Sequence, residues 1–302
     1  MIESAYGFDV YGGFKKFLRS IDDLRSYYFA YDWRKSPGYQ GTQRALDNFV
    51  DKTLEASGRD KVVLVAHSMG GLVARAYINS HSEKVARVLT IATPYWGAAM
   101  PWLALAHGLT GPPTDSWWPD LDTFIPNDEL QLFAINAAGA YNLYPSPAYY
   151  EQIGGWLSFS GTSGGITYLT QDQTLSAVRQ FLGNKSLYKQ ALDYHTSYLD
   201  TYYSNPNVPW QMIVGTGVKT LTGIVYQEDS AKPTYIYGNG DGTVPILSSA
   251  EGVEDTSIVH YVCRIEHSAL PEQKGVQAMI KDYIYTGGPI VNPQGGFCEP
   301  PE

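Results

Sequence analysis

Residues 62–78 join an apolar run, a turn that carries a serine, and an apolar helical stretch without interruption. The turn reads Ala66-His67-Ser68-Met69-Gly70-Gly71, after Val62-Val63-Leu64-Val65 and before Leu72-Val73-Ala74. A buried strand, a tight turn and a helix in this order form a nucleophile elbow. A neutral serine is a poor nucleophile, so its hydroxyl must be exposed to a base and lie near backbone N–H groups. The segment therefore predicts Ser68 as a nucleophile.

Small residues flank this serine, as the strained turn requires. Ala66 stands where the first glycine of the pattern is usual, and Gly70 keeps the second. Gly71 is predicted to let the following helix lie close against the sheet.

An acid and a base follow the serine in the chain order that this elbow demands. Asp241 lies in the glycine-rich turn Gly238–Pro245, where residues without bulky side chains let the loop point a carboxylate at a fixed target. His267 follows the predicted strand 257–265. Serine, then an acid, then histidine is the order of an α/β-hydrolase triad, in which the acid orients the imidazole.

The aspartate and the histidines also have other interpretations. An aspartate in a glycine-rich turn is often only a turn residue, but a calcium loop here would need ligands at Tyr237 and Ser248 and therefore fails. Among the six histidines, His67 adjoins the nucleophile and is predicted to be structural, and His260 lies within a strand. The others lie in a polar loop or in the insertion described below: His81, His107 and His195.

The composition excludes several classes of partner. A net charge of −9 without a basic cluster argues against nucleic acid and against electrostatic attachment to anionic membranes. Two cysteines make neither a disulfide framework nor a metal site, so we expect no metal, no cofactor and an inert Cys263. No obligate protein partner is evident. A surface rich in tyrosine and poor in lysine favours a soluble protein outside the cell.

Strand and helix patterns alternate through residues 1–96 and again through 210–286, which predicts a mostly parallel sheet with helices on both faces. The first part includes a helix at 13–24, a strand at 27–31, a helix at 43–57 and a strand at 85–92. The alternation stops at 97–209, which we interpret as an inserted cap. Residues 287–302 are rich in glycine and proline and are predicted to be a tail or linker.

Several short motifs occur together in one order: Tyr31-Asp32-Trp33-Arg34, the elbow, Val214-Gly215-Thr216-Gly217-Val218, Gly240-Asp241-Gly242-Thr243-Val244-Pro245 and Glu266-His267. Over roughly residues 20–285 this combination resembles the lecithin:cholesterol acyltransferase-like family of α/β-hydrolases, which includes lysosomal phospholipases and phospholipid:diacylglycerol acyltransferases. The resemblance implies an acyl-serine intermediate and a lipid or other ester substrate. It also implies the triad Ser68, Asp241 and His267, with the Met69 N–H donating to the oxyanion.

The chain departs from that family in its upstream part and in its cap. The loop that would supply a second oxyanion donor is not evident, and losing one such donor typically costs about a hundred- to a thousandfold in turnover. Gly7, Gly12 or Gly13 belongs to a substitute loop, or the chain is trimmed, or the enzyme is impaired. The membrane-binding segment of the animal members has no counterpart, and residues 97–209 contain no cysteine to staple the cap.

The leading expectation is a serine ester hydrolase of the lipase, phospholipase or esterase type that acts on lipid-like or other apolar esters, with a lipid interface as a further partner. Acyl transfer to an alcohol is the alternative enzyme activity, and a catalytically impaired fold used for binding is the alternative class. Trp102, Trp117 and Trp118 are candidates for an apolar acyl groove, the alternative being that they form the core of the cap.

Overall fold

The structure is a computed structural model. It describes residues 4–5, 8–9, 11–108, 126–160, 166–181, 183–200, 208–227, 232–253, 257–288 and 298.

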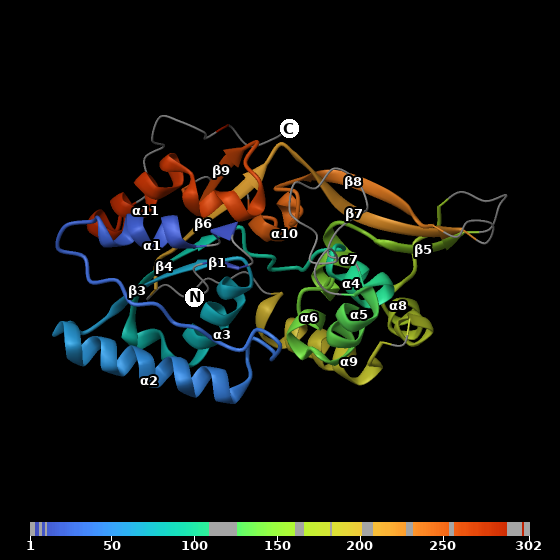
Figure 1. Cartoon of the computed structure of the whole chain (residues 1–302), viewed down its shortest axis with the longest axis horizontal. Helices are drawn as coiled ribbons and strands as arrows, with labels where there is room; N and C mark the ends of the chain where they lie inside the picture. Colours follow the sequence, from blue (N-terminus) through green and yellow to red (C-terminus); the bar gives the residue numbers. More distant parts are fainter. Residues whose placement is uncertain are drawn as a thin grey trace.

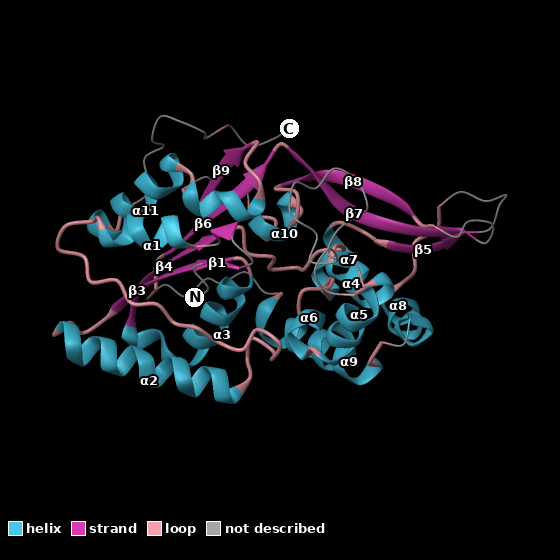
Figure 2. Ribbon diagram, viewed as in Figure 1, coloured by secondary structure: helices cyan, strands magenta, loops and turns pink. Residues whose placement is uncertain are grey.

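The central sheet has four parallel strands, and Figures 1 and 2 show it between helices. Their order is β3-β4-β6-β9, and each pairs in parallel with its neighbour. The strands span Val62–His67, Val85–Ile91, Trp210–Thr216 and Val259–Cys263. Parallel strands need helical crossovers, so a sheet of this kind is covered on its faces by helices.

Helices cover both faces of this sheet because alternate strand residues point to opposite sides. Helices α2 (Gln40–Ser57) and α3 (Met69–His81) pack on one face, in an apolar cluster that contains Val88 and Met212. Helices α1 (Gly12–Arg19) and α11 (Lys274–Thr286) pack on the other, in a cluster with the adjacent strand residues Leu89 and Ile213.

The expected strand at residues 27–31 is not a strand in the structure. The segment Tyr27–Tyr31 runs without regular secondary structure. A strand requires a hydrogen-bonded neighbour, and among the described residues none forms a ladder with this segment. The aromatic run predicted a strand, but a run of residues cannot show whether a partner strand lies beside it.

A second sheet joins the insertion to a later part of the chain. It contains β5 (Leu157–Ser160), β7 (Val218–Gln227) and β8 (Thr234–Gly240) in the order β5-β7-β8. Strand β5 pairs with β7 in parallel, and β7 with β8 antiparallel. Strands β7 and β8 lie within the range predicted as core, yet β7 pairs with a strand of the insertion and β8 pairs with β7. Figure 1 places this sheet beside the helices of the insertion, at one end of the molecule.

The remaining elements are short. The helices of the insertion are α4 (Pro101–His107), α5 (Asn127–Asn136), α6 (Ala138–Tyr141), α7 (Pro147–Gln152), α8 (Gln171–Ala177), η3 (Val178–Phe181), α9 (Lys185–Tyr194) and η4 (His195–Leu199). Elsewhere lie β1 (Ser4–Ala5), β2 (Phe8–Asp9), η1 (Ser82–Lys84), α10 (Ile246–Ala250) and η5 (His267–Glu272). None of the helices described here is long and apolar enough to cross a membrane.

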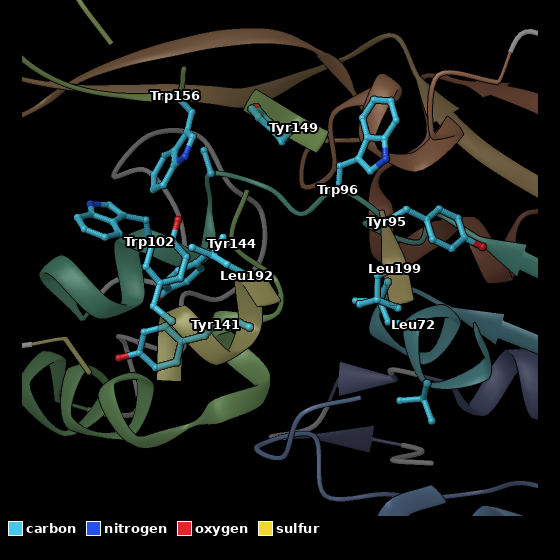
Figure 3. Close-up of a cluster of buried hydrophobic side chains, with 14 of the residues drawn as sticks. Leu72, Tyr95, Trp96, Trp102, Tyr141, Tyr144, Tyr149, Trp156, Leu192 and Leu199 are labelled. Atoms are coloured by element: carbon cyan, nitrogen blue, oxygen red, sulfur yellow. The ribbon is translucent and has the colours of Figure 1, made fainter. Parts of the chain in front are cut away.

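Aromatic side chains form the core of the insertion. Trp102 packs edge-on against Trp156 and Tyr144, with ring centroids 5.5 and 6.2 Å away, and these side chains gather in Figure 3. Trp102 has no exposed surface, and its indole N–H donates to Tyr226 Oη at 3.0 Å. The expectation that Trp102 lines an acyl groove is therefore wrong for this structure, because neighbouring rings enclose it. Residues 117 and 118, the other two groove candidates, lie outside the described residues.

The two cysteines form a disulfide, which the sequence analysis did not predict. Cys263 at the end of β9 bonds to Cys298, with the two Cα atoms 5.9 Å apart. The Cys298 N–H also donates to Tyr261 O at 3.2 Å, so this residue of the tail lies against the edge of the sheet. The two cysteines are 35 residues apart, so no local pattern indicated the pairing, and the expectation of an inert Cys263 did not include this bond.

Candidate active site

Ser68 occupies the turn between β3 and α3 in a strained backbone conformation. Its φ is 54° and its ψ is −132°, a region that residues with a side chain rarely adopt. Such a conformation costs about 1–3 kcal/mol and persists only when its surroundings enforce it. Here the Ser68 N–H donates to Ile91 O and the Gly71 N–H donates to Ser68 O, each at 2.9 Å. The serine is thus held half-buried at the carboxyl end of β3.

The two glycines after Ser68 have different roles. A Cβ on Gly71 would lie 1.9 Å from Thr93 Oγ1 and 2.6 Å from Thr93 Cγ2, so only glycine lets α3 approach the segment after β4. A Cβ on Gly70 would meet only the Cβ of Ala66, at an ordinary contact distance of 3.8 Å. The tightest position of the elbow is therefore Gly71.

His267 and Asp241 complete a chain of hydrogen bonds that begins at Ser68. His267 Nε2 lies 2.9 Å from Ser68 Oγ, and His267 Nδ1 lies 2.7 Å from Asp241 Oδ2. A carboxylate can only accept, so Nδ1 carries the proton and Nε2 is left to accept from the serine hydroxyl. The main-chain N–H of His267 also donates to Asp241 O at 2.8 Å. The structure thus brings together the three residues that the sequence singled out.

Asp241 is buried, and both oxygens of its carboxylate accept hydrogen bonds. Only 1% of the residue is exposed, and Oδ1 accepts the N–H groups of Thr243 and Val244 at 3.0 and 2.7 Å. A Cβ on Gly215 of β6 would lie 2.5 Å from Asp241 Cβ, so glycine there makes room for the carboxylate. Gly242 has a φ of 91°, which lets the turn close. Asp241 directly follows β8, and so it stands where the second sheet returns to the core.

A second carboxyl group adjoins this pair. Burial, followed by the nearby Asp241, raises the pKa of Glu266, while His267 opposes the shift. A Cβ on Gly242 would lie within contact of Glu266 Oε2, so this side chain covers the turn that carries Asp241.

Met69 is the first residue of α3, so its N–H has no acceptor within the helix. Donors and the positive end of the helix dipole at this point suit an oxyanion beside Ser68. Of the residues considered for a second donor, Gly12 and Gly13 begin α1, and a Cβ on Gly13 would collide with the Glu272 carboxylate. Residue 7 lies outside the described residues.

The remaining histidines fall outside this chain of hydrogen bonds. His260 lies in β9 and donates from Nε2 to Gln211 Oε1 at 2.6 Å, and burial lowers its pKa to about 4. His107 of the insertion bonds to Tyr226 Oη of β7 at 2.8 Å, and His195 bonds within the insertion to Asp200 Oδ1 at 2.9 Å. Within the described part of the chain, no group of three His, Cys, Asp or Glu side chains is placed to hold a metal ion.

Two residues reach the site that the sequence analysis did not assign to it. His67 Nε2 lies 3.1 Å from the main-chain oxygen of His267, and Tyr11 Oη lies 2.7 Å from His67 Nδ1. The sequence predicted His67 to be structural. It contains no signal for Tyr11, which lies 56 residues before His67 in the chain.

The chain is similar in sequence to known proteins. Residues 24–112 match the family described as Lecithin:cholesterol acyltransferase. The chain is thus similar to the lecithin:cholesterol acyltransferase-like family that its sequence motifs indicated. It is 25% identical over 314 residues to "Lecithin-cholesterol acyltransferase-like 4" of Arabidopsis thaliana, a match that covers 89% of this chain and 57% of that protein.

Two further relatives extend the comparison. "Lysosomal phospholipase A and acyltransferase" of Canis lupus familiaris is 23% identical over 248 residues, covering 73% of this chain and 52% of the relative. "Phospholipase A(1) LCAT3" of Arabidopsis thaliana is 23% identical over 262 residues, covering 74% and 57%. The chain thus spans about half the length of the curated relatives it matches.

A solved structure supports the fold. The chain matches "The crystal structure of Tle4-Tli4 complex" with a TM-score of 0.59 at 17% identity, covering 81% of this chain and 65% of the other. Together with the mostly parallel sheet between helices, this match confirms the predicted α/β-hydrolase fold.

Proposed function

We propose that this lecithin:cholesterol acyltransferase-like chain is a serine ester hydrolase with Ser68 as nucleophile, His267 as base and Asp241 as the residue that orients His267. The observation that carries the proposal is the continuous hydrogen-bond chain from Ser68 Oγ through His267 to Asp241, on an elbow whose serine has a φ of 54°. Such a constellation is recognised by its geometry and roles, whatever the fold around it.

The proposed reaction has two halves. Ser68 Oγ attacks the ester carbonyl carbon while His267 Nε2 takes the hydroxyl proton, and the Met69 N–H donates to the oxyanion that forms. The tetrahedral intermediate collapses, the ester C–O bond breaks, and His267 returns the proton to the leaving alcohol. Water then attacks the acyl-serine in the same way and releases the carboxylic acid and free Ser68. Asp241 remains a carboxylate throughout and stabilises the imidazolium.

The substrate class follows from the relatives. Their names describe phospholipases and acyltransferases, which supports a lipid or other apolar ester as substrate and a lipid interface as the place of reaction. Acyl transfer shares the first half-reaction and differs only in that an alcohol replaces water in the second. The names of the relatives equally favour this alternative. An impaired fold used for binding has less support, because the hydrogen-bond chain is complete.

Two features of the whole chain belong to the same proposal. The Cys263–Cys298 disulfide supports a secreted or extracellular protein, because disulfides persist in oxidising compartments.

The pairing of β5 with β7 supports a cap that comprises residues 97–209 together with β7 and β8, on a core of residues 1–96 and the rest of 210–286.

A fluorophosphonate probe tests the nucleophile directly. We expect the wild-type chain to be labelled on Ser68 and to hydrolyse p-nitrophenyl esters, and Ser68→Ala to do neither while melting at the same temperature. Labelled protein without turnover would favour the impaired fold, and unlabelled protein would refute the serine mechanism. Adding a long-chain alcohol and measuring ester formation against acid release then separates acyl transfer from hydrolysis.

A further inference from the structure

The residue before the nucleophile contacts the catalytic base. The ring of His67 lies 4.8 Å from the ring of His267, with 41° between their planes. His67 Nε2 is 3.1 Å from the main-chain oxygen of His267. On the other side of the same ring, Nδ1 is 2.7 Å from Tyr11 Oη, and the tyrosine ring meets the imidazole edge-on.

The chemistry of these contacts fixes where the protons are. A carbonyl oxygen can only accept, so His67 Nε2 must carry a hydrogen and donate it to His267 O. Burial, and then the charge of His267, hold the pKa of His67 well below its usual value, so the ring is neutral and Nδ1 has a free lone pair. Burial raises the pKa of Tyr11 to about 12, so its hydroxyl keeps the proton that it donates to Nδ1. The tyrosine thereby selects the His67 tautomer that can bind His267.

We propose that Tyr11 and His67 are positioning residues that hold the main chain of His267 in the geometry needed to act as base. The inference rests on the proposed function. Asp241 O accepts the main-chain N–H of His267, and His67 donates to its main-chain oxygen, so this residue is held on both sides of its Cα. The imidazole is then aimed by two further bonds, to Asp241 and to Ser68.

Such support matters because His267 stands at the junction of a loop and a short helix. It is the first residue of η5, and Arg264, three residues earlier, has a φ of 59°. A short 3₁₀-helix has poorer hydrogen-bond geometry than an α-helix and gives little support of its own. A misplacement of about 1 Å at a reacting group costs on the order of a hundredfold in rate.

Three variants test the proposal. His67→Phe keeps the ring volume but removes the donor, and we expect kcat on p-nitrophenyl esters to fall about 10- to 100-fold with KM within about twofold. His67→Gln, whose side-chain amide has a donor near the position of Nε2, should recover most of that loss. Tyr11→Phe should lower kcat by less, because the correct His67 tautomer remains accessible without being selected.

A double variant separates this role from a general loss of stability. Because Tyr11 acts only through His67, Tyr11→Phe should have no further effect on kcat in the His67→Phe background, whereas unrelated packing defects would add. In ¹⁵N NMR spectra of the wild-type chain, His67 should stay neutral with its proton on Nε2 from pH 5 to 8. That readout does not depend on activity.

The opposing outcomes are equally specific. Unchanged kcat in His67→Phe, additive losses in the double variant, or a His67 ring that titrates between pH 5 and 8 would each overturn the positioning role. If the wild-type chain is not labelled by a fluorophosphonate, the proposed function fails. If it is labelled and His67→Phe is labelled at the same rate, only this inference fails.

Discussion

Arg75 on α3 and Glu251 after α10 form a bidentate ion pair in which each side chain is only 1% exposed. The Arg75 guanidinium also donates to Leu199 O at 2.8 Å and lies 4.2 Å from the centroid of the Tyr95 ring. The pair therefore links α3, the helix that begins directly after Ser68, to α10 and to the insertion.

Removing the cation should strongly destabilise the fold. Arg75→Met leaves Glu251 buried without its partner, and breaking such a pair costs about 3–5 kcal/mol. Urea unfolding measures this difference. Lys189→Met is the matched control, because Lys189 and Asp193 pair on the surface with 63% and 64% of their side chains exposed, and such pairs contribute about 0.5 kcal/mol or less. Equal effects of the two substitutions would contradict the prediction.

The two histidines of the last strand region should differ in their effect on activity. His267→Ala should reduce ester hydrolysis by at least about a thousandfold, since members of a triad act as a unit. His260→Gln should leave kcat within about threefold, because the His260 side chain bonds to Gln211 and not to Ser68, Asp241 or His267. Initial rates at pH 8 measure both, and a larger loss in the His260 variant would reassign the base.

His260 should instead make stability depend on pH. Its pKa is lowered to about 4 in the folded chain against about 6.5 in an unfolded one, so between these values the unfolded chain binds more protons. This contribution is fully present above pH 6.5 and is lost as the pH falls toward 4, to a maximum of about 3 kcal/mol. Urea unfolding at pH 7 and pH 4.5 should therefore show a smaller loss in His260→Gln than in the wild type. The same loss in both would mean that His260 does not titrate as stated.

Trp102 should affect stability and not the choice of acyl chain. Trp102→Ala removes a fully enclosed ring and should cost about 3–5 kcal/mol. The dependence of kcat/KM on acyl length, measured from acetate to dodecanoate esters well below the melting temperature, should keep its shape. A flattened dependence would return Trp102 to the acyl site.

The disulfide should stabilise the fold without being required for the chemistry. A loop of this length contributes about 3–4 kcal/mol in the chain-entropy description, so a Cys263→Ala/Cys298→Ala variant should unfold at lower urea. Its kcat at 25 °C should match the wild type, and a reducing agent should destabilise only the wild type. A drop in kcat with reduction would instead tie the bond to the position of His267.

The sequence predicted the elements whose signal is local. The apolar runs and the helical periodicity gave β3, β4 and α2 within a few residues, and the order of serine, acid and base gave the three side chains that the structure joins. These patterns arise within single elements or from the order of motifs along the chain.

Contacts between residues that are far apart in the sequence could not be predicted. The strand-like segment 27–31 lacks a partner among the described residues, and β7 pairs with a strand of the insertion and not with the central sheet. Neither fact is encoded in the period of the segment itself, because any extended run can pair with any exposed edge. Tyr11 was not predicted to contact the site for the same reason, since no motif near it in the sequence indicates a contact with His67.

Asp241 follows β8 directly, whereas helices α4 to α7 lie between β4 and β5, and α8 and α9 lie between β5 and β6. A displacement of the second sheet is therefore transmitted to Asp241, because Val218 of β7 forms a bridge with Asp241 itself. We therefore expect changes of length in the loops between helices α4 to α9 to leave Asp241 in place, whereas changes of length in the hairpin of β7 and β8 would move its carboxylate relative to His267.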